Sequence, residues 1–510
     1  MAGGDGRPPA LDSGGMHSPA PAARAHGLPG ARALRPPVAA ARRPLPALLL
    51  AVVAAGCGGS KPPSVPPPAC ALPTPQPSAF PAAQVIELGV QPVGTQRSFT
   101  VPPGTGSVTI LQQGTEPSAA QTITYQGSTY GNTVVPYRVF ANGVEIYNDG
   151  VTPPADPAAN GGVPVYFWTE AVWTGTLTVP NTSSLLQSGV PSGTWTIEVN
   201  DYARECKGTR DCTIGNGADY PPGRYDVKVL LKPGPVPAAG GIDVVFQVLS
   251  IDPVLNGPDP LSNPSVKRMR DTLAQLLGNA GLVLGGVSFR PLPASVKDHF
   301  ATGVGGATVV NADDALPCGD LATLLQSSGP GNAMNVFLVD RFSSTQDGTS
   351  GAITVGLDGA VPGPSSVGGT VASGAAVSVA NLFSGTIACA GAPSFRACGA
   401  DKTAYIAAHE IGHFLGLYHD TEAIGTFFDP VADTPTCPCS ACRPAGAVDR
   451  CYGATGVTVD TAYQMTGTDC TPSTACGGGD NLMFWLVSAS STGTVSTDQA
   501  RIVRANPLVR

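Results

Sequence analysis

Residues 409–419 read His-Glu-Ile-Gly-His-Phe-Leu-Gly-Leu-Tyr-His, and this stretch decides how the rest of the chain is interpreted. On a helix, His409 and His413 lie one turn apart on the same face, so both imidazoles can bind one zinc ion. Gly416 tolerates left-handed backbone angles at little cost, so the helix can end there and the chain can turn back. We expect His419 to be the third ligand. Three protein ligands leave the fourth position for water, which is typical of a catalytic zinc site.

The scarcity of histidine strengthens this interpretation. A bare His-Glu-x-x-His pattern arises by chance on amphipathic helices, but this chain has only six histidines and three of them fall within this one stretch. Glu410 follows the first ligand and is placed to act on a water activated by the metal rather than on the metal itself. The pattern therefore predicts Glu410 as the general base and acid of a hydrolytic site.

The motif resembles the signature of the metzincin zinc endopeptidases, in which a long zinc-binding motif is followed by a methionine-containing turn. Downstream, residues 429–435 (Asp-Pro-Val-Ala-Asp-Thr-Pro), Asn481-Leu482-Met483 and residues 496–499 are similar to the pappalysin branch. The resemblance covers the chain well from about residue 400 onward and the preceding part of the domain only in outline. It implies that Met483 forms an apolar floor below the histidines.

The same resemblance implies calcium as a second metal, held by Asp429 and Asp433, with ordinary turn capping by these aspartates as the alternative. Two positions depart from the branch. Asp420 follows the third histidine where pappalysins more often have threonine. Trp485 stands where related enzymes carry a tyrosine that can hydrogen-bond the reaction intermediate, and an indole cannot replace that phenol.

The first 56 residues have the features of an export signal. Arg42 and Arg43 precede a short apolar run, residues 45–55, which is too short to span a bilayer. Small residues then lead to Cys57, a pattern that resembles the bacterial lipobox and implies cleavage before Cys57 and acylation of its thiol. An ordinary signal peptide with an incidental cysteine is the alternative. We expect an exported protein, either an outer-membrane or cell-surface lipoprotein anchored to the membrane at Cys57 or a secreted one.

Composition agrees with export. The formal net charge is −8, only 13% of the residues are charged, and basic clusters are absent from the sequence, which argues against nucleic acid as a partner. The chain has 13 cysteines; setting Cys57 aside leaves an even number, so disulfides are expected in an oxidising compartment. Cys437, Cys439 and Cys442 could suggest a thiolate metal site, but in an exported protein we expect them to form disulfides as well. The local pairs expected are Cys206–Cys212, Cys389–Cys398 and Cys470–Cys476.

The fold class expected is a multidomain chain, an N-terminal all-β sandwich followed by an α+β metzincin-like zinc protease domain. Residues 57–81 are rich in proline and serine and read as an extended linker after the anchor. Residues 82–235 are expected to form the sandwich, because short strand-like runs recur between turn signals. Residues 192–201 resemble a strand of the P-domain and prepeptidase C-terminal sandwiches, with Trp195 in the core. The expected strands are residues 96–101, 107–112, 134–140, 163–169, 175–179, 194–199 and 225–231.

Residues 240–510 are expected to form the catalytic domain. The apolar run 242–249 predicts a buried strand, and Asn263-Pro264 predicts the start of a helix whose apolar positions follow steps of three and four. Strands are expected at residues 287–289 and 335–339, with an edge strand at 376–379. Asp401 or Thr403 is expected to cap the zinc helix, and His299 is expected to be a surface or structural histidine.

The function expected is an exported zinc-dependent endopeptidase that acts on extracellular proteins or peptides. A catalytically weak, zinc-containing surface binding protein or adhesin is the alternative, which the replacement of tyrosine by Trp485 makes worth testing. A third interpretation gives the sandwich the main role, as a module that binds glycan or protein.

Overall fold

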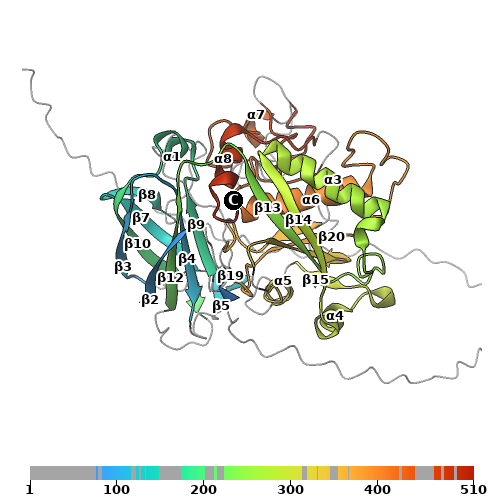
Figure 1. Cartoon of the computed structure of the whole chain (residues 1–510), viewed down its shortest axis with the longest axis horizontal. Helices are drawn as coiled ribbons and strands as arrows, with labels where there is room; N and C mark the ends of the chain where they lie inside the picture. The colour runs from blue at the N-terminus through green and yellow to red at the C-terminus, as the bar shows by residue number, and fades with distance from the viewer. Residues whose placement is uncertain are drawn as a thin grey trace, which may run out of the picture. The chain divides into compact units, whose positions relative to one another are not determined.

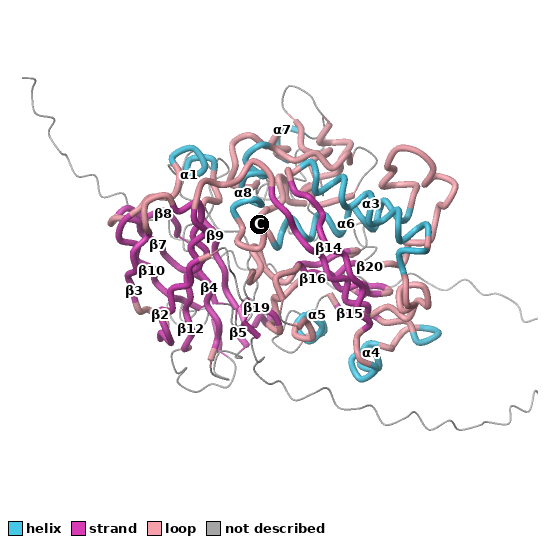
Figure 2. Tube along the Cα trace, viewed as in Figure 1, coloured by secondary structure: helices cyan, strands magenta, loops and turns pink. Residues whose placement is uncertain are grey.

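The computed structural model describes residues 76–77, 83–115, 122–125, 128–131, 134–148, 174–201, 212–214, 223–312, 319–329, 331–344, 354–365, 367–423, 425, 428–442, 465–471, 476–487 and 491–510. These residues belong to one compact unit, Val65–Arg510, with a mixed α/β architecture (Figures 1 and 2). The leader 1–56, Cys57 and most of the linker lie outside the described residues. The predicted domain boundaries at 82–235 and 240–510 stay predictions.

Two four-stranded antiparallel sheets form the N-terminal part, with strand orders β2-β12-β4-β9 and β3-β10-β7-β8. The strands are β2 (Gln84–Pro92), β3 (Gln96–Val101), β4 (Thr105–Gly114), β7 (Val134–Ala141), β8 (Val144–Asn148), β9 (Thr174–Val179), β10 (Gly193–Asp201) and β12 (Arg224–Pro233). Six of the seven strands predicted here fall within these elements, and residues 163–169 lie outside the described part. Strands β2 and β8 were not predicted.

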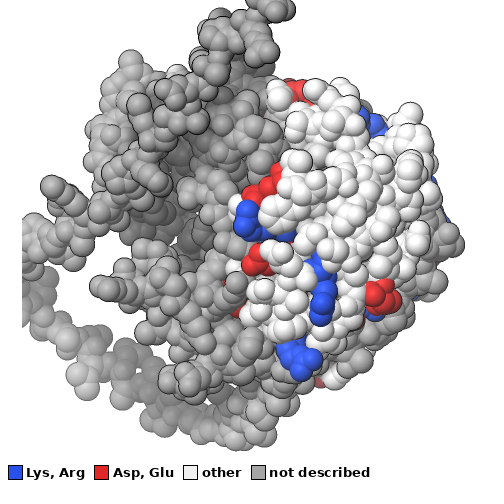
Figure 3. All heavy atoms as spheres, turned by 90° about the vertical axis from the view of Figure 1, so that its left-hand side faces the viewer, with Lys and Arg blue, Asp and Glu red and all other residues white. Residues whose placement is uncertain are grey.

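Both sheets contribute to one hydrophobic cluster around Trp195, which is fully buried as predicted. The cluster also includes Phe99 of β3, Ile110 of β4 and Val229 of β12. On the face shown in Figure 3, described charged side chains of both signs lie scattered among uncharged ones. The smaller elements of this part are β5 (Thr122–Tyr125), β6 (Ser128–Gly131) and β11 (Cys212–Ile214), which form one sheet, and helix α1 (Ser183–Ser188).

A five-stranded sheet with the order β14-β13-β16-β20-β18 forms the centre of the C-terminal part. Its strands are β13 (Gly240–Val248), β14 (Leu282–Pro291), β16 (Met334–Val339), β18 (Gly356–Asp358) and β20 (Ala375–Ser378). All neighbours are parallel except β18, which runs antiparallel to β20. The prediction that residues 376–379 form the edge strand was therefore wrong, because β18 covers that side. A three-residue strand that begins with glycine gives no alternating pattern by which it could be recognised.

Two long helices pack against this sheet and one another, α3 (Pro264–Asn279) and α6 (Gly399–Phe414) (Figure 2). Asn263 caps α3 as predicted, because its Oδ1 accepts a hydrogen bond from the Ser265 N–H at 2.9 Å. The predicted apolar face of α3 is buried throughout: Val266, Met269, Leu273, Leu276 and Leu277. This face belongs to the same hydrophobic cluster as the strands β13, β16 and β20 and helix α6.

The remaining elements connect these layers. They are β1 (Gln76–Pro77), which pairs with β19 (Val367–Gly368), β15 (Val309–Asn311), which pairs with β17 (Arg341–Ser343), the 3-10 helices η3 (Pro260–Ser262) and η4 (Val304–Gly306), and the helices α4 (Ala294–Phe300), α5 (Asp320–Leu325), α7 (Cys439–Cys442) and α8 (Thr497–Ala505). Among the described residues, none of the helices has the length and apolar character needed to cross a membrane.

Three disulfides are present in the described part. Cys389–Cys398 is confirmed. The predicted bond Cys470–Cys476 is wrong, because Cys470 pairs with Cys437 and Cys476 with Cys442. These bonds tie together segments 33 and 34 residues apart, within an apolar cluster that includes Met465 and Phe484, instead of closing a short local turn. The expected pair Cys206–Cys212 rests on residues that the structure does not describe fully.

Candidate metal centre

Helix α6 carries the first two predicted ligands. Most of its residues are small or apolar, and all but two of them are buried. The helix begins at Gly399, and Cys398 occupies the N-cap position without a side-chain hydrogen bond, so neither Asp401 nor Thr403 is the cap. Asp401 instead lies in the first turn, where its carboxylate binds Arg268 of α3. His409 and Glu410 lie further along α6, and both are buried.

The chain turns back after α6 as the sequence predicts. Leu415 is the C-cap residue, and Gly416 has a φ of 111°, a backbone angle that other residues rarely adopt. The Gly416 N–H donates to the His413 carbonyl at 2.8 Å and the Leu417 N–H to the Gly412 carbonyl at 2.9 Å. The turn brings His419 back to the first two histidines.

The three imidazoles converge through their Nε2 atoms. The Nε2–Nε2 distance is 3.1 Å between His409 and His413, 3.1 Å between His413 and His419, and 3.2 Å between His409 and His419. Among the described residues, this trio is the group of histidine, cysteine, aspartate and glutamate side chains placed to hold a metal ion.

The Nδ1 atoms of two of the histidines have hydrogen-bond partners that orient their rings. The Nδ1 of His409 lies 2.7 Å from the Leu482 carbonyl oxygen, and the Nδ1 of His413 lies 2.7 Å from the Leu417 carbonyl oxygen. Because a carbonyl oxygen only accepts, both Nδ1 atoms carry the proton and both Nε2 atoms present a lone pair. The Nδ1 of His419 lies 3.0 Å from Oε1 of Glu422.

These observations fit a bound cation. Unprotonated nitrogens about 3 Å apart cannot hydrogen-bond to one another, so their lone pairs need a positive ion between them. Burial, with His419 adding to it, lowers the pKa of His409 to about 3, and burial lowers the pKa of His413 as well. The neutral imidazole is the form that binds zinc, and a nitrogen-only donor set suits zinc at Zn–N distances of ~2.0–2.1 Å.

Glu410 lies beside the edge strand β18. Its side chain is almost fully buried, and burial raises its pKa to about 8. A Cβ atom at Gly356 of β18 would lie 2.2 Å from Glu410 Oε1, so glycine at position 356 makes the space that the carboxylate occupies. The carboxylate of Glu410 therefore lies between helix α6 and strand β18.

Met483 lies against helix α6 at Gly412, the residue before His413, and its role as the floor of the site stays a prediction. It is fully buried, and a Cβ atom at Gly412 would lie 2.6 Å from its sulfur, so the glycine between the two helical ligands lets the methionine approach α6. The Met483 N–H donates to Asn481 Oδ1 at 2.8 Å. The Asp420 N–H, directly after the third histidine, donates to the Met483 carbonyl at 3.3 Å.

The two aspartates predicted as calcium ligands serve as hydrogen-bond acceptors within the chain. Asp429 accepts from Thr434 Oγ1 at 2.6 Å and from Gln499 Nε2 at 3.1 Å. Asp433 accepts from Ser496 Oγ at 2.7 Å and from the Asp498 N–H at 2.9 Å. Their oxygens satisfy the first turn of α8, so the structure does not support the calcium site and agrees with the capping alternative.

Two other predicted positions have structural roles in the described part. The Trp485 Nε1–H donates to the Met465 carbonyl oxygen at 2.7 Å, and its ring packs on the cluster that contains the two loop disulfides. His299 is half-buried, with its ring edge-to-face on Phe300 and its Nε2 3.7 Å from Asp320 Oδ1. The lipidation site Cys57 lies outside the described residues.

The sequence did not predict four contributors to the site: Glu422, Asn481, Gly412 and Gly356. Glu422 had one signal, since it is an acid three residues after His419. The segment after Gly416 is not helical, however, so a spacing of three residues does not predict that the two side chains meet. The two glycines act through the room they leave for residues that are distant in the sequence, which local patterns cannot show.

Comparison with known proteins is informative at the level of the family. No curated protein matches the chain. A family model does match part of it, and the matched segment includes the three histidines and Glu410 but neither α3 nor Met483. Residues 307–473 thus match Reprolysin_5, described as metallo-peptidase family M12, and the three-histidine site lies in this metallopeptidase domain.

Proposed function

We propose that the protein is a zinc-dependent endopeptidase in which His409, His413 and His419 hold the metal and Glu410 transfers protons. The observation that carries this proposal is the convergence of three Nε2 atoms, 3.1–3.2 Å apart, with the rings of His409 and His413 oriented by hydrogen bonds at Nδ1. Three protein ligands leave one coordination position open, as in catalytic zinc sites. The match to metallo-peptidase family M12 supports the same assignment.

When bound, zinc supplies a Lewis acid that polarises the peptide carbonyl and makes water acidic enough to attack it near neutral pH. Glu410 accepts the proton of the attacking water and then delivers it to the departing amine. Its buried position beside the first ligand supports this role, because burial raises the pKa of Glu410 and so makes its carboxylate a stronger base.

The peptide substrate is proposed to lie along β18. This strand ends the sheet in the described part, and its first residue, Gly356, adjoins Glu410. An extended peptide that pairs with a free strand edge is held by its backbone, which presents its carbonyl groups in a regular row.

The finer assignments rest on the sequence. We propose a metzincin of the pappalysin-like branch, from the long histidine motif and the segments around Asp429 and Met483. We also propose export, with anchoring at Cys57 or secretion, and proteins or peptides outside the cell as substrates. The two N-terminal sheets, which share one cluster around Trp195, are interpreted as a sandwich that resembles the P-domain and prepeptidase C-terminal type.

The test is cleavage of a peptide library by the purified protein, followed by mass spectrometry. The parent should cleave, lose activity with a zinc chelator and regain it when zinc is added back. Glu410→Gln should keep its zinc but cleave ~10²–10⁴-fold more slowly, the range for removing a general base. Glu87→Gln, on an exposed strand, is the matched control and should cleave like the parent.

Two results would count against the proposal. Glu410→Gln cleaving as fast as the parent would show that this carboxylate is not the base. A zinc-loaded parent that cleaves none of the library would favour the alternative of a surface binding protein.

A further inference from the structure

Gln499, in the first turn of α8, is fully buried and makes more contacts than a helix cap requires. As part of the capping box, its Oε1 accepts from the Ser496 N–H at 3.0 Å. The same oxygen accepts from Asn481 Nδ2 at 2.9 Å, while its Nε2 donates to Asp429 Oδ2 at 3.1 Å. Capping does not need the contact with Asn481, so that contact has a different role.

Asn481 connects Gln499 to the turn that contacts His409. Its side-chain Oδ1 accepts from the Met483 N–H at 2.8 Å, and its backbone carbonyl accepts from the Tyr405 hydroxyl of α6 at 2.9 Å. Between Asn481 and Met483 lies Leu482, whose carbonyl oxygen is 2.7 Å from His409 Nδ1. The orientation of that carbonyl therefore depends on both anchors of the turn.

Burial makes this chain of hydrogen bonds sensitive to each member. Asn481 is 3% exposed and Gln499 0%, so loss of either side chain leaves a polar partner without water as a substitute. The Leu482–Met483 peptide would then lose one of the hydrogen bonds that orient it, and the Leu482 carbonyl would hold the Nδ1 proton of His409 less firmly.

We infer that Gln499 is a positioning residue of the metal centre, which acts through Asn481 and the Leu482 carbonyl to hold His409 in its ligating orientation. The inference deepens the proposed function and rests on the zinc site, but not on peptide cleavage. Gln499 lies 90 residues after His409 and outside the segment that matches the family model.

The test measures zinc affinity of the purified protein by competition with a chelator, so that it does not depend on turnover. Gln499→Met keeps the length of the side chain and removes its polar atoms. This variant should weaken zinc binding about tenfold, the lower end of the range for residues that hold metal ligands in place without binding the metal. It should also change the visible absorption spectrum of Co²⁺ bound in the site. Ser496→Ala is the matched control: it removes the cap hydroxyl, which accepts from the Gln499 N–H at 3.1 Å, but leaves the contact with Asn481.

A second variant covers the case in which Gln499→Met does not fold. Asn481→Ser is too short to reach Gln499 and should weaken zinc binding by the same factor. Because Gln499 acts only through Asn481, the double variant should bind zinc as tightly as Asn481→Ser alone. Equal zinc affinities for Gln499→Met and the parent, or an equal loss in Ser496→Ala, would overturn the inference. A parent that binds zinc without cleaving peptides would refute only the proposed function.

Discussion

At the scale of single residues, the orientation of each histidine ring depends on the group that its Nδ1 atom faces. Two Nδ1 atoms face backbone carbonyl oxygens, but that of His419 faces the carboxylate of Glu422. Burial acts to raise the pKa of Glu422, but its interactions with His419 and the Ala423 N–H outweigh burial and lower the pKa, so this acid is ionised beside the site. A carboxylate behind a histidine raises the basicity of the ring and fixes its orientation.

We predict that Glu422→Gln weakens zinc binding ~10–100-fold, because the amide keeps the shape of the side chain but loses its charge. The measurement is zinc affinity by chelator competition, with the exposed Glu87→Gln as control. Unchanged affinity in Glu422→Gln would mean that the carboxylate only fills space.

The sequence could predict the ligands but not their partners. The period of a helix fixes the positions of His409, Glu410 and His413 relative to one another, so their spacing in the sequence is enough to predict them. The turn after the helix could be predicted because glycine, the residue at position 416, readily adopts the positive φ that the structure shows. Leu482 and Asn481 lie more than 70 residues from His409, and a backbone carbonyl has no sequence signature.

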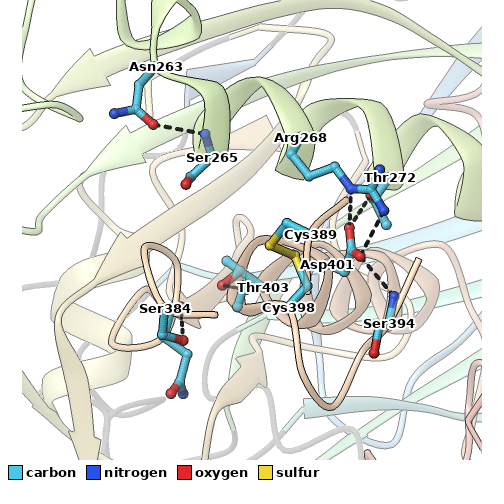
Figure 4. The surroundings of a disulfide bond; sticks show 12 residues. Asn263, Ser265, Arg268, Thr272, Ser384, Cys389, Ser394, Cys398, Asp401 and Thr403 are labelled. Carbon is cyan, nitrogen blue, oxygen red and sulfur yellow. Dashed lines mark hydrogen bonds and ion pairs between the residues drawn. A yellow bond between two sulfur atoms is a disulfide. The ribbon is translucent and has the colours of Figure 1, made fainter. Parts of the chain in front are cut away.

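At the scale of elements, a buried ion pair fixes the zinc helix to α3 (Figure 4). Asp401 of α6 accepts from Arg268 Nε at 2.7 Å, from Thr272 Oγ1 at 2.6 Å and from the Ser394 N–H at 2.8 Å. Burial acts to raise the pKa of Asp401, but these hydrogen bonds outweigh it and the pKa is lowered from 3.8. The neighbouring disulfide Cys389–Cys398 holds the chain that enters α6.

We predict that Asp401→Asn lowers the free energy of unfolding by about 3 kcal/mol, the lower end of the range for a buried pair, because Arg268 stays partly exposed. Since the folded pKa lies below 3.8, the ionised group stabilises the protein above pH ~4 and this contribution is lost as pH falls further. Urea unfolding should show that loss in the parent and not in the variant. Asp271→Asn, which breaks exposed pairs on α3, should change stability by less than about 1 kcal/mol.

The elements differ in how far the sequence predicts them. Helix α3 was predicted closely, because its cap and its apolar face are both local signals. The start of α6 was misjudged, because the aspartate that suits a cap is used in a tertiary ion pair instead. Strand β18, which lies next to Glu410, has only three residues and begins with glycine, which is too little to be recognised.

At the scale of the whole described molecule, the N-terminal sheets and the C-terminal part are joined through α8. Lys232 of β12 donates to the carbonyl oxygens of Arg504, Asn506 and Val509 at 2.7–3.2 Å, where α8 ends. At the other end of α8, Asp498 accepts from Ser183 of α1. These contacts join segments more than 260 residues apart, which is why no sequence pattern predicted them.

We predict that Lys232→Met destabilises the protein by about 2 kcal/mol, because three partly buried carbonyl oxygens lose their donor. Lys228→Met, four residues earlier on β12 and paired with Glu87 at the surface, is the matched control and should cost less than about 1 kcal/mol. Urea unfolding compares the two. Equal stabilities would show that the ends of α8 do not depend on the N-terminal sheets.

The central claim, that three imidazoles hold one zinc and leave a position open, is tested most directly by X-ray absorption at the zinc edge. Protein loaded with one equivalent of zinc should show three imidazole ligands and one further light atom at ~2.0–2.1 Å, and His419→Ala should show two imidazoles. Sulfur ligands at ~2.3 Å, or fewer than three imidazoles in the parent, would contradict the account.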